Sequence, residues 1–152
     1  MGRYGIYPYR SRVGVTMSHD QNEMENGMTL TLQILDGYYT IHRFPADSTL
    51  PVEVWESSFL SITKTEDELS IVCDASIVLD TEVNESGWSG IKVLGPLDFA
   101  LTGILAKLSG VLAEARISIF AISTYDTDYI LVQSEKLELA VKVLSKQGYI
   151  II

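Results

Sequence analysis

The stretch that decides the fold is Ile117-Ser-Ile-Phe-Ala-Ile-Ser-Thr-Tyr-Asp-Thr-Asp-Tyr-Ile-Leu-Val132. Its two ends are apolar runs typical of buried strands, and short polar side chains separate them. These side chains are Ser123, Thr124, Asp126, Thr127 and Asp128. Forming a sheet does not require so many hydroxyl and carboxyl groups at one strand end. The pattern therefore predicts recognition, either of a small ligand with an ammonium group or of a partner surface.

Two amphipathic helices flank this pair of strands. Before it, apolar residues recur at three- and four-residue steps and predict a helix that ends near Ala115; they are Leu101, Ile104, Leu105, Leu108, Leu112 and Ala115. After it, Leu137, Ala140, Val141 and Leu144 mark a second helix, which Gly148 ends. With strands at residues 90–94 and 149–152, the order is strand, helix, strand, strand, helix, strand. That order predicts an α+β, ferredoxin-like fold with both helices on one face of an antiparallel sheet.

The first half of the chain predicts a hairpin and two further strands. Residues 29–35 and 38–44 flank Asp36-Gly37, a strong signal for a two-residue hairpin in which Leu32 faces Ile41 and Ile34 faces Tyr39. Residues 59–62 and 70–73 are the other strands. The capping-box spacing of Thr65 and Glu68 predicts one short helical turn between them. Residues 75–87 are acidic and predict a loop.

An internal similarity links the two halves. Residues 61–72 resemble residues 121–132 with one residue inserted, and both place threonine and acidic residues between two apolar runs. This indicates two related units in tandem. We therefore expect one module over residues 28–89 and another over residues 90–152. A tail over residues 1–27, which is either disordered or docks on a partner, precedes them.

Charge and composition argue against several classes of function. A formal net charge of −9 argues against a nucleic-acid binder, because phosphate contacts need a basic face. The single cysteine, Cys73, excludes a disulfide framework and a four-cysteine zinc site, and its apolar surroundings predict burial. His19 and His42 share no ligand spacing, so we expect neither a metal site nor a cofactor.

The sequence also suggests where the protein works. No segment approaches the ~20 apolar residues of a membrane span, and the N-terminus lacks the apolar core of a signal peptide. We therefore expect a cytoplasmic protein that does not enter a membrane. No nucleophile–base pair or phosphate loop is visible, so an enzyme is the least favoured class. Trp55 and Trp88 are expected to be structural, in the core or at an interface.

Longer segments carry a resemblance to a known family. They are Gly95-Pro-Leu-Asp-Phe-Ala-Leu-Thr-Gly-Ile-Leu105, residues 112–120, residues 123–132 and, in the first half, residues 65–72. These segments resemble the ACT-domain proteins of the CASTOR type, and the resemblance covers roughly residues 29–152. It implies two tandem ACT modules and no catalysis. It also implies binding of a small effector, usually an amino acid, at an interface between modules.

The resemblance also implies which residues form the ligand site. One module contributes the strand positions Ser118 and Ile119. The other contributes the helix start at Gly103, Ile104 and Leu105 and the loop residues Thr124, Tyr125, Thr127 and Asp128. Because this chain has one copy of each element, a complete site implies a homodimer.

Two departures from the family keep alternatives open. The eukaryotic proteins of the CASTOR type sense arginine, and they have a carboxylate near the position of Leu101. Because this chain has leucine there, the resemblance does not imply that its ligand is arginine. The turn over residues 125–128 also matches a segment that these proteins use for protein contact. The alternative function is therefore a protein-interaction module that uses residues 123–128 and binds no metabolite.

The residue chemistry is compatible with an amino-acid ligand. Thr102 can cap the helix, Gly103 allows close approach, and the amides of the first turn lack partners within the helix. A carboxylate placed there gains about 1 kcal/mol. Plain capping by Thr102 or Asp98 is an equally good interpretation. Asp128 suits an ammonium group, whereas a local turn explains Asp126 better.

Overall fold

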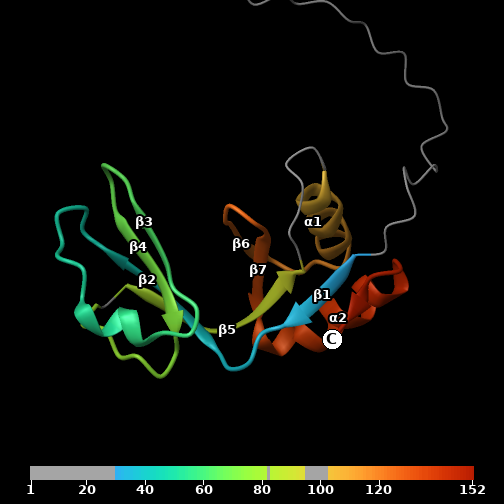
Figure 1. Cartoon of the computed structure of the whole chain (residues 1–152), viewed down its shortest axis with the longest axis horizontal. Coiled ribbons are helices and arrows are strands. Elements are labelled where there is room, and N and C mark those ends of the chain that lie inside the picture. Colours follow the sequence, from blue (N-terminus) through green and yellow to red (C-terminus); the bar gives the residue numbers. More distant parts are fainter. Residues whose placement is uncertain (1–29, 82, 95–102) are drawn as a thin grey trace, which may run out of the picture.

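The computed structural model of the chain describes residues 30–81, 83–94 and 103–152. The predicted tail, Asp98, Leu101 and Thr102 lie outside these residues. Within them, eight strands form one sheet: β1 (Thr31–Ile34), β2 (Tyr39–Phe44), β3 (Ser61–Lys64), β4 (Leu69–Asp74), β5 (Asn84–Val93), β6 (Ile119–Ser123), β7 (Asp128–Gln133) and β8 (Ile150–Ile151). The helices are α1 (Ile104–Glu114), α2 (Leu137–Lys146) and the 3-10 helices η1 (Val52–Glu56) and η2 (Ser134–Lys136). The predicted mixed α+β class is confirmed (Figure 1).

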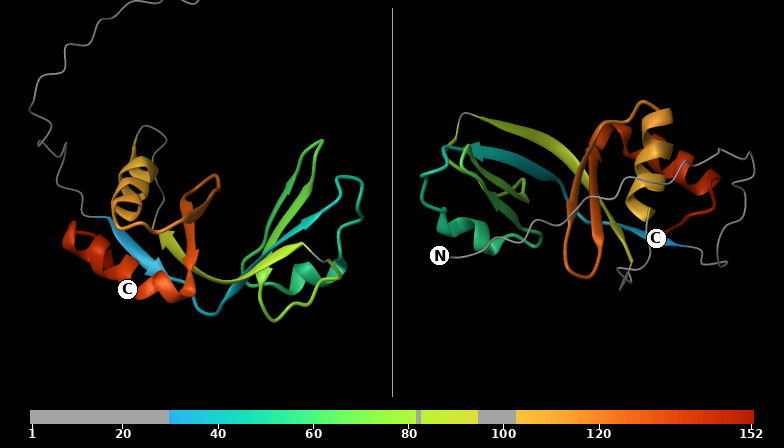
Figure 2. Two further views of the ribbon diagram at one scale, coloured as in Figure 1. Left: turned by 180° about the vertical axis from the view of Figure 1, so that it is seen from behind. Right: turned by 90° about the horizontal axis from the view of Figure 1, so that it is seen from above.

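β5 is the strand that joins the two halves of the molecule. Its first part pairs with β2 and its last part pairs with β1, both along the same edge. β7 pairs along the opposite edge, from Trp88 to Lys92. Figure 2 shows β5 running from the lobe of β2, β3 and β4 into the lobe that contains the two α-helices. The two halves therefore share one continuous strand.

The predicted hairpin of residues 29–35 and 38–44 is wrong. β1 and β2 do not pair with each other: Leu32 lies opposite Val93, and Tyr39 lies opposite Trp88. Both strands are antiparallel to β5, so the chain bends at Asp36-Gly37 and continues in the same direction. Gly37 has the positive φ that a two-residue hairpin also needs. The chain bends here and does not form a hairpin, because both strands pair with the same edge of β5.

The start of β5 is also a correction. The acidic segment predicted to be a loop up to residue 87 enters the strand at Asn84. Tyr39 and Ile41 are two residues apart on β2, but their partners Trp88 and Glu85 are three apart on β5. One extra residue therefore makes a bulge in β5, and Gly87 has a φ of 79° there. The glycine that looks like a loop residue in the sequence is what lets the strand continue.

The second half has the predicted order of elements. β5, α1, β6, β7, α2 and β8 follow one another as expected, but β1 is inserted between β5 and β8. Leu108 and Leu112 of α1 and Ala140 and Leu144 of α2 pack in one buried cluster with residues of the sheet. α1 has Ala115 at its C-cap, and Gly148, with a φ of 90°, follows the end of α2. Among the described residues, the predicted helix faces and C-terminal ends are thus confirmed.

The first half has its own core beneath η1. Val54, Leu69, Ile71 and Cys73 belong to this buried cluster, which confirms the predicted burial of Cys73. Burial, and then the nearby Asp74 charge, raise the pKa of its thiol. Thr65 does not begin a helical turn as predicted. Its N–H bonds to the Glu68 carbonyl at 2.9 Å and closes a hairpin turn between β3 and β4.

Candidate functional site

The predicted recognition loop is the four-residue turn between β6 and β7. The Thr124 N–H bonds to the Thr127 carbonyl at 2.8 Å, and the Thr124 hydroxyl donates to the same carbonyl at 2.9 Å. The same hydroxyl accepts from the Thr127 N–H at 3.3 Å. The turn thus uses these polar groups to satisfy its own backbone. We expected the hydroxyl and carboxyl groups of residues 123–128 to be unnecessary for forming the sheet. This expectation is wrong for Thr124, whose hydroxyl helps to close the turn.

Thr127 ties this turn to the end of β5. It is only 6% exposed, and its hydroxyl donates to the backbone carbonyl of Val93. The hydroxyl proton is thus committed to the fold, because breaking the bond would leave a buried acceptor without a partner. Thr127 therefore positions the loop, while its exposed neighbours Tyr125 and Asp126 form the accessible part of the turn.

Asp128 is the partly exposed carboxylate at the base of the turn. It lies opposite Ser123 in the β6–β7 ladder and accepts a 2.5 Å bond from the Ser123 hydroxyl. That bond occupies Oδ1. A carboxylate has about four lone-pair sites in total, so Asp128 retains capacity to accept from an ammonium group. The serine holds the carboxylate in place at the strand end.

The start of α1 presents backbone rather than side chains. Gly103 is the N-cap in the left-handed conformation, with φ 80° and ψ 6°, and its carbonyl accepts from the Lys107 N–H at 2.9 Å. A Cβ at Gly103 would meet nothing within 4 Å among the described residues, so this is an open position. The adjacent side chains of Ile104 and Leu105 are partly buried against the core. The first-turn amides are thus the polar groups that this segment offers.

The two strand positions, Ser118 and Ile119, follow the end of α1. Arg116 has a φ of 57°, its N–H bonds to Ala113, and the Ile117 N–H bonds back to Leu112. This is a Schellman-type helix end, which turns the chain into β6. Ser118 is exposed and Ile119 is partly buried. Among the described strands β6 pairs only with β7, so its other edge carries no strand.

The predicted site residues therefore fall into separate segments of one chain. Figure 1 shows the β6–β7 turn and the start of α1 at the upper side of the same lobe. Within the described residues, no hydrogen bond or ion pair links Asp128 to Gly103, Ile104 or Leu105. Thr102 lies outside these residues. A single chain offers the parts of the predicted site without one enclosed pocket.

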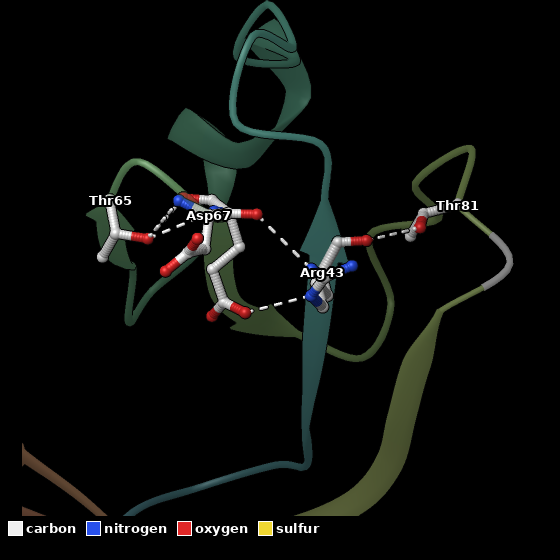
Figure 3. Close-up of polar contacts among 5 residues, drawn as sticks. Arg43, Thr65, Asp67 and Thr81 are labelled. Atoms are coloured by element: carbon white, nitrogen blue, oxygen red, sulfur yellow. Dashed lines mark hydrogen bonds and ion pairs between the residues drawn. The ribbon is translucent and has the colours of Figure 1, made fainter.

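A second candidate region lies on the sheet face where β2, β4 and β5 approach β6. It is a pocket of about 540 Å³ lined by charged residues (Arg43, Glu68 and Glu85), by the polar Ser70 and Asn84, and by apolar and aromatic residues that include Ile41, Trp88 and Phe120. Arg43 Nε donates to Glu68 Oε2 at 3.0 Å, and Arg43 Nη2 donates to the Asp67 carbonyl at 3.4 Å (Figure 3). Arg43 is thereby fixed at the rim by the β3–β4 turn.

Two buried side chains in this region keep polar atoms without partners: Trp88 at the pocket, and His42 on the opposite face of β2. Trp88 is 6% exposed and His42 is 4% exposed. Among the described residues, Trp88 Nε1 and both ring nitrogens of His42 have no hydrogen-bond partner. Burial lowers the pKa of His42, which keeps the ring neutral at pH 7. The sequence predicts only a structural role for Trp88 and does not predict this pocket. A glycine directly before Trp88, Gly87, is the one local sign of the bulge that shapes it.

Trp55 is not in the core, which was one of the two structural positions expected for it. It lies on η1 with 69% of its surface exposed, so any structural role it has is not in the core of this chain. Within the described residues, no group of three or more His, Cys, Asp or Glu side chains is arranged to hold a metal ion. No described helix has the length and hydropathy to cross a membrane.

Comparisons with known proteins match two parts of the chain. A family model for the ACT domain matches residues 83–146, and a second model, for an N-terminal domain, matches residues 37–79. The cytosolic arginine sensor for mTORC1 subunit 1 of Pongo abelii is 32% identical over 124 residues, which are 75% of this chain and 37% of that protein. The Homo sapiens protein of the same name gives the same identity and coverage. The chain thus spans 37% of the length of these relatives.

Solved structures share the fold. A crystal structure of an Agrobacterium tumefaciens protein is 36% identical, with a TM-score of 0.77, and the match covers 83% of this chain and 94% of that chain. The aspartate kinase of Clostridium acetobutylicum is 15% identical, with a TM-score of 0.61, over 85% of this chain and 37% of that one. At that identity the likeness to the kinase concerns the fold alone.

Proposed function

Because this chain belongs to the ACT-domain proteins of the CASTOR type, we propose that it is a non-catalytic regulatory protein that senses an amino acid. The ligand lies at an interface between ACT modules of two identical chains. The C-terminal ACT module over residues 90–152 supplies the site, and residues 28–89 form the N-terminal ACT-like module. We place the protein in the cytoplasm, in line with the printed name of the relatives.

The open edge of β6 is the observation that carries this proposal. Ser118 and Ile119 lie at the start of that edge, where a second copy can approach. That copy would bring its own Gly103 amides and Asp128 carboxylate to the same place. A zwitterion fits this combination, since the amides bind its carboxylate and Asp128 binds its ammonium group. Ligand that bridges two chains would couple occupancy to dimer geometry.

A protein-interaction module is the second candidate. The Tyr125 side chain is 81% exposed at the tip of the β6–β7 turn, while the hydroxyls of Thr124 and Thr127 are engaged within the turn or with β5. An exposed aromatic residue on a hydrogen-bonded turn suits a protein partner. In this case no metabolite binds, and residues 123–128 form the contact.

A thermal-shift screen with the twenty amino acids tests the first candidate. Ligand at about a hundred times its dissociation constant adds roughly 2.7 kcal/mol and raises the unfolding midpoint. We expect Asp128→Asn to abolish the shift, because the substitution removes the charge that binds the ammonium group and keeps the shape. Asp126→Asn is the matched control two residues away, and it should leave the shift unchanged.

Light scattering after size exclusion provides the second measurement. We expect the ligand-bound protein to be a dimer. If no amino acid shifts the midpoint while Tyr125→Ala abolishes capture of a protein partner, the interaction module replaces the sensor. An equal shift in the Asp128→Asn and Asp126→Asn variants would remove Asp128 from the site.

A further inference from the structure

We propose that the pocket bounded by β2, β4, β5 and β6 is a second ligand site, separate from the interface between modules. It binds a small organic cation that carries an apolar ring and one oxygen acceptor. The whole pocket belongs to a single chain, so this site does not depend on the dimer.

The charges of the pocket favour a cation. Arg43 is already compensated, because its guanidinium bonds to Glu68 and to the Asp67 carbonyl. Glu85 has no ion pair among the described residues, and the His42 ring lies on the opposite face of β2, beside Phe44. One guanidinium and two carboxylates leave a net charge of −1 at the pocket. Glu85 is therefore the group left to bind an ammonium.

The aromatic lining favours an apolar ring on the ligand. The Trp88 and Phe120 rings lie 6.5 Å apart between centroids at an interplanar angle of 63°. Ile41 extends the apolar surface, as it packs partly buried against the cluster that contains Trp88. Faces of such rings attract cations, and the apolar surface binds a ring of the ligand.

Trp88 also supplies a hydrogen-bond donor. Its Nε1 is buried without a partner among the described residues, and a donor in that state costs free energy. An acceptor on a ligand reaches this atom when the atoms that cover it shift on binding. A hydroxyl or carbonyl oxygen on the ligand would satisfy it. The ligand class therefore combines a cation, a ring and an oxygen.

The bulge in β5 brings Glu85 and Trp88 to the same face of the sheet. In a regular strand, residues 85 and 88 would point to opposite faces of the sheet. The extra residue at the bulge puts Glu85 opposite Ile41 and Trp88 opposite Tyr39, on one face, because Tyr39 and Ile41 are two residues apart on β2. Glu85 and the Trp88 ring thus face the same pocket. A bulge that redirects a side chain in this way is common beside functional sites.

Trp88 fluorescence provides a direct test. Trp55→Phe removes the exposed indole on η1 and leaves Trp88 as the single tryptophan of the chain. Three probes share a phenyl ring and an oxygen but differ in charge: phenylalaninol is a cation, phenylalanine a zwitterion and N-acetylphenylalanine an anion. We expect phenylalaninol to change the Trp88 emission saturably and to bind most tightly, and the anion to bind least.

Glu85→Gln then tests the role of the carboxylate. We expect it to weaken phenylalaninol binding about tenfold, which corresponds to about 1.4 kcal/mol. Glu53→Gln, the same substitution on η1 outside the pocket, and Asp128→Asn should leave the affinity unchanged. Glu85 and Glu53 are both exposed, so each variant should keep its fold, which circular dichroism can check. Equal binding of the three probes, an unchanged affinity in Glu85→Gln, or no saturable change in emission would each overturn the proposal.

Discussion

His42 lies under β2 with both ring nitrogens buried and without partners among the described residues. Alternation along β2 places it on the side of Phe44, whose ring centroid is 6.5 Å away. A neutral imidazole tolerates this environment better than a charged one, because burial penalises the charged form. At the scale of single residues, the fold thus sets the protonation state of a side chain that the sequence left unassigned.

The buried histidine predicts a dependence of stability on pH. Because burial lowers the pKa of His42 in the folded state, the unfolded chain takes up the proton more readily. The free energy of unfolding therefore keeps its full value with respect to His42 above the unfolded pKa of about 6.5. It decreases as the pH falls from there toward the lower pKa of the folded state. We expect the free energy of unfolding to fall by up to about 1.4 kcal/mol per pH unit below pH ~6.5.

Urea denaturation of the natural chain and of His42→Leu from pH 8 to pH 5.5 measures this loss. The difference between the free energies of unfolding of the two chains removes the effect of carboxylates, which titrate in both. If the free energy of His42→Leu decreased with pH as steeply as that of the natural chain, another group would be responsible.

The two turns between paired strands show the internal similarity at the scale of elements. In the β3–β4 turn the Thr65 hydroxyl accepts from the Glu68 N–H at 3.1 Å, as the Thr124 hydroxyl accepts from Thr127 in the β6–β7 turn. In both turns the threonine N–H also bonds to the carbonyl three residues later. The resemblance of residues 61–72 to residues 121–132 therefore corresponds to the same local turn. The capping-type spacing of Thr65 and Glu68 is real, but it closes a hairpin.

Gly90 shows why an element sometimes requires one residue type. A Cβ at this position would lie 2.7 Å from Leu35 Cδ1 and 3.2 Å from Tyr39 Cε2. These neighbours come from the bend between β1 and β2, which crosses β5 closely at this point. We expect Gly90→Ala to destabilise the fold by about 1–3 kcal/mol through overpacking.

Gly110 is the matched control for this substitution. It lies exposed in the middle of α1, and a Cβ there would meet nothing within 4 Å. Gly110→Ala should stabilise the fold by roughly 0.5–1 kcal/mol, because alanine favours the helix. Chemical denaturation of the two variants checks both signs. Equal effects would contradict the close approach at Gly90.

At the scale of the whole molecule, the two predicted modules share one strand at their boundary. The proposed division between residues 89 and 90 falls inside β5, which pairs with β2 before it and with β1 after it. β1, from the start of the chain, is also inserted between β5 and β8. The buried Leu32 of β1 contributes to the core of the second half.

This shared architecture predicts the behaviour of fragments. We expect residues 90–152 alone to lack a cooperative unfolding transition, because the fragment loses β1 and the first part of β5. Residues 30–152 should unfold in one transition. Circular dichroism during thermal unfolding distinguishes the two. A cooperative transition in the shorter fragment would show that β1 is dispensable and that the division at residue 90 is a true domain boundary.

Local pattern in the sequence determined the helices, the order of elements in the second half and the polar turn between β6 and β7. Helical periodicity, glycine at helix ends and apolar runs act within a few residues, so they can be read without knowledge of the rest of the fold. Gly103 at the helix start and Asp128 at the strand end also lie where these signals place them.

Only the tertiary structure decided which strands pair. Asp36-Gly37 fits a hairpin and a bend equally well, and the choice depends on β5, about fifty residues away along the chain. The bulge at Gly87, and with it the common face of Glu85 and Trp88, depends on the same pairing. Strand register follows from long-range burial and hydrogen bonding, which local propensity does not encode.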